Sequence, residues 1–185
     1  NGITLGSDPG FSVSSIYKPS INSSGGAQLI TTATNAYVAF TCDGQYIAKY
    51  DNTNNIIWVK QIDQALGDAI AINFVSVGSK VKAVFRSSDG LSSVIIELND
   101  SDGSVLTSTI ASHSVTGGNV SATYASVSST GYVAIGGVCS ISGMGNQAYL
   151  AVYNDSGILT GSKTFGTNSG YNVDCYGVTI TGNGS

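Results

Sequence analysis

His113 is the only histidine of the chain, and imidazole is the side chain best suited to moving protons near neutral pH. It lies in the short polar stretch Ser112-His-Ser-Val, between two apolar runs. A Ser–His–acid mechanism would place its nucleophile on an elbow such as GxSxG, and the sequence contains no such motif. We therefore expect His113 to be a solvated loop residue, and we expect the protein not to be an enzyme.

The best candidate for metal binding is the segment Asn99-Asp-Ser-Asp-Gly-Ser104. Oxygen-bearing side chains at Asn99, Asp100 and Asp102, followed by a glycine, are similar to half of a calcium loop. The equivalent segments at 51–55 and 154–157 lack the same acids, which favours an ordinary turn. Calcium binding by these three residues is the alternative, and no other cofactor is expected.

Aromatic side chains are the main candidates for ligand binding. The chain has 10 Tyr and a single Trp against 5 Phe, and exposed tyrosines can stack on sugar rings. Tyr46, Trp58 and Tyr149 are the residues we would choose for such a surface. Tyr46 and Tyr149 occupy matching positions of a repeated pattern, however, and repetition of that kind also predicts packing between strands. Both interpretations remain open at this point.

The remaining reactive side chains carry little information. Most of the 11 acidic residues fall in turns, and no two occupy matching positions of neighbouring strands as a carboxylate pair for hydrolysis would. Cysteines occur at 42, 139 and 175, and this spacing excludes zinc sites of the CxxC type. Buried free thiols in strands are the favoured interpretation, and a single disulfide with one free thiol is the alternative.

Composition restricts the classes of partner. Only 10% of residues are charged, and the net charge of −4 with 7 scattered Lys and Arg argues against nucleic acid. No run of 18 apolar residues exists, so no membrane-spanning segment is expected. The chain opens at Asn1 without an initiator Met, which indicates either removal of an upstream segment or a piece of a longer protein.

Neutral polar residues and 24 Gly, with only 2 Pro, suit many short strands joined by tight turns. Such turns join apolar runs in a hairpin pattern that occurs three times, at 45–62, 93–110 and 148–165. Each hairpin is preceded by two further strand-like runs, and the second of these recurs at 36–40, 81–85 and 131–135, with offsets of 45 and 50 residues. The first run, found at 27–33, 69–77 and 120–128, returns a fourth time at 171–180.

The sequence therefore predicts an all-β fold built from four-stranded antiparallel repeats of about 45–51 residues, present three times whole and once as an opening strand. The expected units are 25–66, 67–117 and 118–169, with a partial unit at 170–185. Residues 1–24 stand apart, as an N-terminal strand segment for closure or assembly. Because one four-stranded sheet cannot bury both of its faces alone, stacking of such units in a β-propeller is the favoured architecture. A β-sandwich is the alternative.

The segments AYLAVYNDSGILTGSKTF and QYIAKYDNTNNIIWVKQI resemble the divergent propeller repeats of bacterial, archaeal and phage surface proteins, which include virion tail proteins. The resemblance covers roughly residues 25–185. Only the first unit keeps the tryptophan, at Trp58, and the second unit has Glu97 where the first has Lys49. Membership would imply an extracellular location and a role in adhesion, surface layers or tails.

Three whole units do not make a closed propeller, which has about 4–8 blades. Either residues 1–24 complete the unit begun at Tyr171, or the ring is finished by further sequence or by neighbouring copies. We expect a non-enzymatic structural or adhesion module of a surface assembly, such as a virion tail or a cell-surface filament. Its expected partners are copies of itself, other surface or virion proteins and, in one version, glycans. A carbohydrate-binding lectin-like propeller is the second hypothesis, and a hydrolase built on a propeller is the third.

Overall fold

The structure is a computed structural model that describes residues 27–41, 44–62, 66–115, 118–166 and 172–182. The expected N-terminal segment 1–24 and Cys42 lie outside the described residues. The described elements are all strands, and none of the described residues belongs to a helix that is long and apolar enough to cross a membrane.

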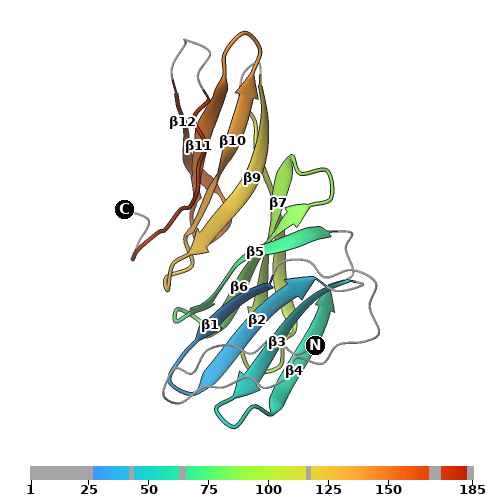
Figure 1. The fold of residues 1–185 in the computed structure, drawn as a ribbon. Coiled ribbons are helices and arrows are strands. Elements are labelled where there is room, and N and C mark those ends of the chain that lie inside the picture. Colours follow the sequence, from blue (N-terminus) through green and yellow to red (C-terminus); the bar gives the residue numbers. More distant parts are fainter. Residues whose placement is uncertain (1–26, 42–43, 63–65, 116–117, 167–171, 183–185) are drawn as a thin grey trace.

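Twelve strands form three four-stranded antiparallel sheets, each with its strands in chain order (Figure 1). The first sheet contains β1 (Ala27–Thr31), β2 (Asn35–Thr41), β3 (Gln45–Asp51) and β4 (Ile56–Ile62). The second contains β5 (Leu66–Val75), β6 (Lys80–Ser87), β7 (Ser92–Asn99) and β8 (Val105–Ser112). The third contains β9 (Gly118–Val127), β10 (Val133–Ile141), β11 (Asn146–Tyr153) and β12 (Leu159–Phe165).

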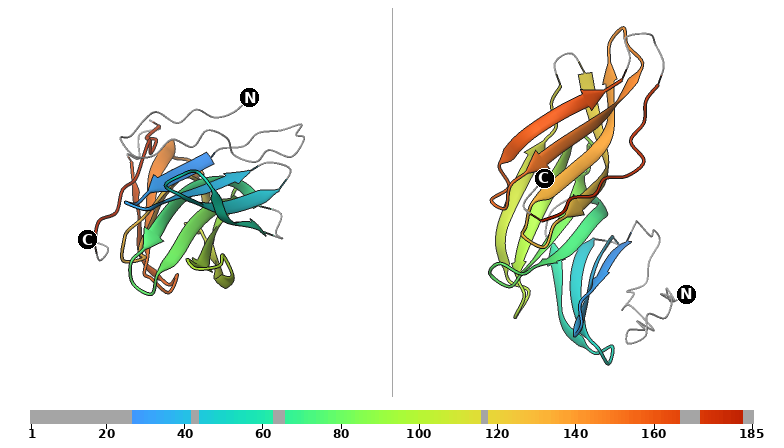
Figure 2. Two further views of the ribbon diagram at one scale, coloured as in Figure 1. Left: turned by 90° about the horizontal axis from the view of Figure 1, so that it is seen from below. Right: turned by 90° about the vertical axis from the view of Figure 1, so that its left-hand side faces the viewer.

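The sheets follow one another along the molecule, with the second sheet between the first and the third (Figure 2). The inner strands β5 and β9 make the main contacts between successive sheets. The prediction of an all-β, propeller-like array of four-stranded antiparallel repeats is confirmed.

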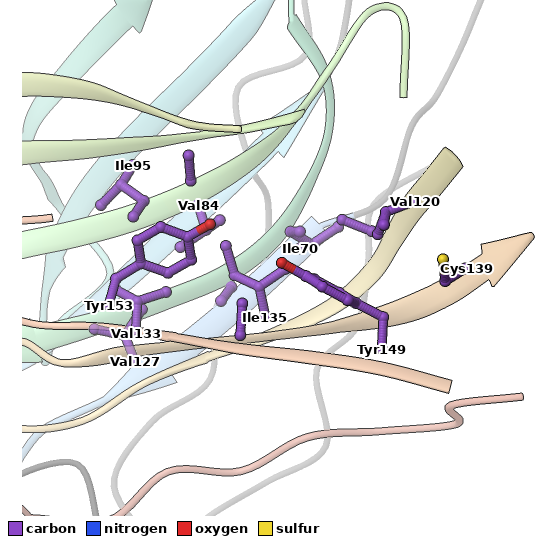
Figure 3. Close-up of a cluster of buried hydrophobic side chains, with 14 of the residues drawn as sticks. Ile70, Val84, Ile95, Val120, Val127, Val133, Ile135, Cys139, Tyr149 and Tyr153 are labelled. Carbon is purple, nitrogen blue, oxygen red and sulfur yellow. The ribbon is translucent and has the colours of Figure 1, made fainter. Parts of the chain in front are cut away.

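Strand periodicity explains how the middle sheet is buried on both faces. In β6, Val81, Ala83 and Phe85 face the first sheet, whereas Val84 faces the third. Tyr37 and Ile47 complete the first of these cores. The second core is filled from the other side by the third sheet, through Val133, Ile135, Tyr149 and Tyr153 (Figure 3). A third cluster, Ala36, Val38, Phe40, Ala48 and Tyr50, lies on the opposite face of the first sheet.

The last hairpin turn has the same construction in all three sheets. Asn54, Gly103 and Gly157 occupy equivalent positions in the turn, with φ of 66°, 70° and 75°. Each turn is preceded by a shift in strand register, at Lys49/Tyr50, Glu97/Leu98 and Val152/Tyr153. A side-chain oxygen at the first turn position accepts a backbone N–H in each case: Asp51 from Asn55, Asn99 from Ser101, and Asn154 from Ile158. The repeat is therefore conserved in backbone geometry even where its residues differ.

The expected opening strand of a fourth unit, at 171–180, is not formed by the described residues 172–182. This segment instead crosses the outer face of the third sheet (Figure 2), with the Val173 amide donating to Asn146 O at 2.7 Å. A Cβ built on Gly136 of β10 would lie 2.7 Å from Cys175 Sγ, so the segment packs directly on that glycine. An apolar alternation alone does not make a strand, because a strand also needs a neighbouring edge with which to form hydrogen bonds.

Cys139 and Cys175 are both free, as the favoured interpretation of the sequence expected for the cysteines. Cys139 is fully buried in β10, and burial raises the pKa of its thiol. Cys175 is only partly buried and lies outside any strand, so the expectation of a strand position is wrong for this residue.

Candidate functional site

A polar latch joins the first sheet to the turn that follows β7. Lys49 of β3 donates to Asp100 Oδ2 at 2.8 Å and to Asp100 O at 3.1 Å. The Tyr37 hydroxyl donates to Asp100 Oδ1 at 2.8 Å, and Trp58 Nε1 donates to Asp100 O at 2.9 Å. Tyr37, Lys49 and Trp58 stand side by side on β2, β3 and β4, so one face of the first sheet holds this turn. We call these four residues the first latch.

Trp58 also fixes the shape of the turn. The indole packs on Gly103, where an added Cβ would lie 2.8 Å from the ring, and Gly103 has a φ of 70° that favours glycine. Burial, followed by the hydrogen bond to Asp100, raises the pKa of the Tyr37 hydroxyl well above its usual range. The first latch is therefore a desolvated contact in which the polar atoms of both sheets are paired.

A second latch joins the second sheet to the turn that follows β11. Lys82 Nζ donates to Gly131 O at 2.8 Å and to Asp155 O at 2.7 Å, and lies 3.2 Å from Asp155 Oδ1. Glu97 Oε1 is also 3.2 Å from Lys82 Nζ, and Glu97 Oε2 accepts from the Thr107 hydroxyl at 3.1 Å. The Lys82 side chain is only 1% exposed.

The two latches occupy equivalent positions in successive sheets, but they are made of different residues. Strand register aligns Tyr37, Lys49 and Trp58 in one sheet with Lys82, Glu97 and Thr107 in the next. Asp100 and Asp155 are likewise the second residues of equivalent turns. Each sheet thus presents a receiving surface to the turn of the sheet that follows it in the chain.

At the same register in the third sheet, Val152 pairs with Gly161, and no described turn is seated there. An open hollow of about 310 Å³ occupies this place instead. It is lined by Leu150, Val152, Thr160, Gly161, Ser162 and Lys163. The equivalent turn of the first sheet, Asp51–Asn55, has Asn52 at the position of Asp100 and Asp155, and Asn52 is exposed.

Replacing Lys49 by Met should lower the free energy of unfolding by about 1–2 kcal/mol, because Asp100 would keep a partly buried carboxylate without its cation. The Asp100 side chain is 19% exposed, so water would offset part of the loss. Chemical denaturation at neutral pH measures the effect. Lys60→Met, on β4 and outside both latches, is the matched control and should change stability by less than about 0.5 kcal/mol. Equal losses in the two variants would contradict the role of the first latch.

The predicted ligand-binding residues are not brought together. Trp58 is in the core between the first and second sheets, and Tyr149 is in the core between the second and third. Tyr46 packs against the third cluster, where its ring stacks on Phe40 at 5.3 Å. Trp58 and Tyr149 are 8% and 2% exposed, so neither presents a free ring face to a sugar. Packing, the second interpretation of the sequence, describes Trp58 and Tyr149, whereas ligand binding by the half-buried Tyr46 stays a prediction.

In the predicted calcium loop, the side-chain oxygens already accept hydrogen bonds. Asn99 Oδ1 accepts from Ser101, Asp102 Oδ1 accepts from Ser104, and Asp100 is held by the first latch. Hydrogen bonds from Ser104 lower the pKa of Asp102, as expected for a turn-forming carboxylate. Across the described ranges, no group of three or more His, Cys, Asp or Glu side chains is placed to hold a metal ion.

His113 is not the solvated residue expected from the sequence. It is 8% exposed, its Nε2 lies 3.0 Å from the fully buried Ser93 Oγ, and its Nδ1 lies 3.4 Å from the Tyr153 hydroxyl. Desolvation lowers the pKa of His113 from 6.5 to about 4. A Ser–His pair is present, but Ser93 is shielded from solvent, and a tyrosine stands where a catalytic triad has its acid. The pair is therefore built as a neutral packing contact between the second and third sheets.

Comparisons with known proteins add little to this description. No family model matches the chain, and no curated protein matches it. Among solved structures, it is similar to a europium-containing methanol dehydrogenase, with a TM-score of 0.49 and 16% sequence identity. The match covers 80% of this chain and 26% of that enzyme, so the chain spans about a quarter of the enzyme's length.

Sequence reasoning missed both latches and the Ser93–His113 contact. One signal was available, because Asp100 and Asp155 stand at the same place in two of the three repeats. Their partners could not be identified, since Lys49 and Asp100 are 51 residues apart and Lys82 and Asp155 are 73 residues apart.

Proposed function

We propose that this chain is a non-enzymatic structural module of an extracellular surface assembly, and that copies join head to tail. In this arrangement, the hollow of the third sheet receives the Asp51–Asn55 turn of a second copy. The observation that carries the proposal is the equivalence of positions: the first and second sheets hold a turn of this type at the register where the third sheet has its hollow.

At the proposed contact, neutral residues replace both members of the charged pair that forms the first latch. In the first latch, the cation Lys49 faces the anion Asp100. At the equivalent positions, the third sheet has the neutral Val152, and the turn of the first sheet has the neutral Asn52. An acid at position 52 would face the apolar Val152, while Lys163, the cation that lines the hollow, lies over the Phe165 ring at 5.3 Å. A lysine at 152 would add a second cation to this hollow without the anion that Asp100 supplies in the first latch. The surfaces are therefore matched to each other rather than to the latches inside the chain.

The side-chain sizes of the hollow and of the Asp51–Asn55 turn are matched as well. The first latch has a large receiving residue, Trp58, and a small turn residue, Gly103. The third sheet has Gly161 in place of Trp58, and the turn of the first sheet has Asn54 in place of Gly103. The smaller receiving residue leaves room for the larger turn residue.

The two surfaces lie at opposite ends of the molecule, because the β3–β4 turn projects at the end remote from the third sheet (Figures 1 and 2). A contact between them therefore joins two molecules. Such a heterologous contact produces a closed ring or an open filament, according to the rotation between copies. Low charge and the resemblance to surface-protein repeats support a location on a virion or a cell surface. The shielded Ser93–His113 pair and the separated aromatic residues favour this function over a hydrolase or a lectin.

The test introduces one positive and one negative charge at the two facing positions of the proposed contact. Light scattering of the purified chain over a range of concentrations should show association. Val152→Lys and Asn52→Asp should each weaken association about tenfold or more, and the double variant, which recreates the charges of the first latch, should restore it. Leu91→Lys, in an exposed turn outside the contact, is the control. A chain that stays monomeric throughout, or a double variant as weak as the single ones, would overturn the proposal.

A further inference from the structure

The second latch brings together a primary amine and two carboxylates, and the amine and one of the carboxylates are buried. Lys82 Nζ lies 3.2 Å from Asp155 Oδ1 and 3.2 Å from Glu97 Oε1. The side chains of Lys82 and Glu97 are 1% and 7% exposed, and that of Asp155 is 38% exposed. Glu97 Oε1 also lies 3.5 Å from Lys80 Nζ, which forms no described ion pair with Asp155. The first latch holds its turn with one carboxylate, so the carboxylate of Glu97 beside Lys82 is an addition to that arrangement.

We propose that Lys82 and Asp155 react with each other to form an intramolecular isopeptide bond, and that Glu97 transfers the protons of this reaction. The bond would join the second sheet covalently to the turn of the third. It is independent of the head-to-tail contact, which involves neither latch.

The geometry places the reacting groups before any chemistry occurs. Gly131 O and Asp155 O accept hydrogen bonds from Lys82 Nζ and hold the amine beside the Asp155 carboxyl. A Cβ on Gly131 would overlap Asp155 Oδ1, so only glycine lets the carboxyl approach this closely. The Thr107 hydroxyl fixes Glu97 from its other oxygen. Preorganisation of this kind converts a slow bimolecular condensation into a reaction between neighbours.

The reaction balances without any further reactant. The Lys82 ammonium gives one proton to the Asp155 carboxylate through Glu97, and the freed amine attacks Asp155 Cγ to form the C–N bond. Glu97 takes a second proton from that nitrogen and returns it to the departing hydroxyl, so that the C–O bond breaks and water leaves. Glu97 ends as the carboxylate with which it began. The amide nitrogen keeps one N–H, which can donate to Gly131 O or Asp155 O.

Burial favours the product. The Lys82 side chain is 1% exposed, and an ion pair offsets only part of the free energy that it costs to bury such a charge. Condensation removes one positive and one negative charge and replaces them with a neutral amide. Water is a product of the reaction, and the exposure of the Asp155 side chain lets it leave for the solvent.

The first latch provides a comparison within the same molecule, because it contains a Lys–Asp pair without a neighbouring glutamate. Lys49 and Asp100 approach even more closely, at 2.8 Å, but the position of Glu97 is occupied there by Lys49 itself, and Tyr37 donates to the Asp100 carboxylate. Among the described residues, no second carboxylate contacts Lys49 Nζ. If Glu97 is the catalytic residue, Lys49 and Asp100 remain an ion pair.

Intact mass spectrometry of the full chain tests the bond. The folded protein should be lighter than its sequence by the mass of one water molecule, and proteolysis should release a branched peptide containing Lys82 and Asp155. Lys82→Arg should restore the full mass, and the isosteric Glu97→Gln should slow bond formation about 100-fold or more while leaving a folded chain. Asp155→Asn should give the same cross-link by loss of ammonia instead of water. Circular dichroism confirms that each variant is folded.

Lys49→Met is the control and should leave the cross-link unchanged. If folded wild-type protein still has the full mass of its sequence after prolonged incubation, no water has been lost and the proposal is overturned. A cross-link that forms as fast in Glu97→Gln as in the wild type would overturn the role of Glu97. Neither result bears on head-to-tail association, so the two proposals can fail separately.

Discussion

Trp58→Ala is expected to lower the free energy of unfolding by about 3–5 kcal/mol, the usual cost of removing a large aromatic side chain from a packed core. Trp58 is 8% exposed in the core between the first two sheets, and its indole N–H holds Asp100 O. The substitution therefore removes apolar contact, leaves a cavity over the turn and leaves Lys49 Nζ as the remaining described donor to Asp100 O. Denaturant unfolding at neutral pH measures the effect, and Trp58→Phe, which keeps a ring but loses the hydrogen bond, should cost clearly less.

A matched pair of glycines isolates the contact between Trp58 and the turn. Gly103 and Gly90 have nearly the same φ, 70° and 72°, so an alanine at either position is strained by about 1–2 kcal/mol. A Cβ at 103 would meet the indole at 2.8 Å, whereas a Cβ at 90 would meet nothing within 4 Å. Gly103→Ala should therefore be the more destabilising substitution.

That difference should shrink in a Trp58→Ala background, because the clash is then absent. Equal costs for the two glycine variants in the wild-type background would show that Trp58 does not pack on this turn.

The repeat and its strands could be predicted because their signals are local. Alternating apolar residues and the turn residues between them are read within a few positions, and the hairpin at 45–62 corresponds to β3 and β4. The segment at 172–182 shows the limit of this reasoning. Its sequence alternates as a strand does, but among the described residues it lies across the face of a sheet rather than along an edge, and the strand is not formed.

The candidate site was less predictable, because its contacts are between repeats. Lys82 lies in an apolar run, and only the packing of the third sheet shows that its charge meets Asp155. His113 follows β8 in a polar stretch, and its burial depends on Tyr153, 40 residues later in the chain. The types of these residues alone did not show that Lys82 pairs with Asp155 or that His113 contacts Tyr153. The register of each repeat, once known, identifies the positions that face one another.

His113 should make stability depend on pH between 6.5 and 4. Burial lowers its pKa from 6.5 to about 4 in the folded protein, so the unfolded chain takes up a proton first as the pH falls. The contribution of the neutral histidine is complete above pH 6.5 and is lost progressively below it. The loss should total about 3 kcal/mol by pH 4, since each pKa unit corresponds to about 1.4 kcal/mol.

Denaturant unfolding at half-unit steps of pH and constant ionic strength measures this slope. The chain has one histidine, and the described carboxylates whose pKa is lowered, those of Asp51, Asp89 and Asp102, take up protons in the unfolded chain around their ordinary value of 3.8. The interval from pH 6.5 to about 5 lies above that range and therefore reports mainly on His113. In His113→Gln, stability should be lower at pH 7 but nearly flat across this interval. An equally steep slope in that variant would mean that a group other than the Ser93–His113–Tyr153 contact senses the proton at the junction of the second and third sheets.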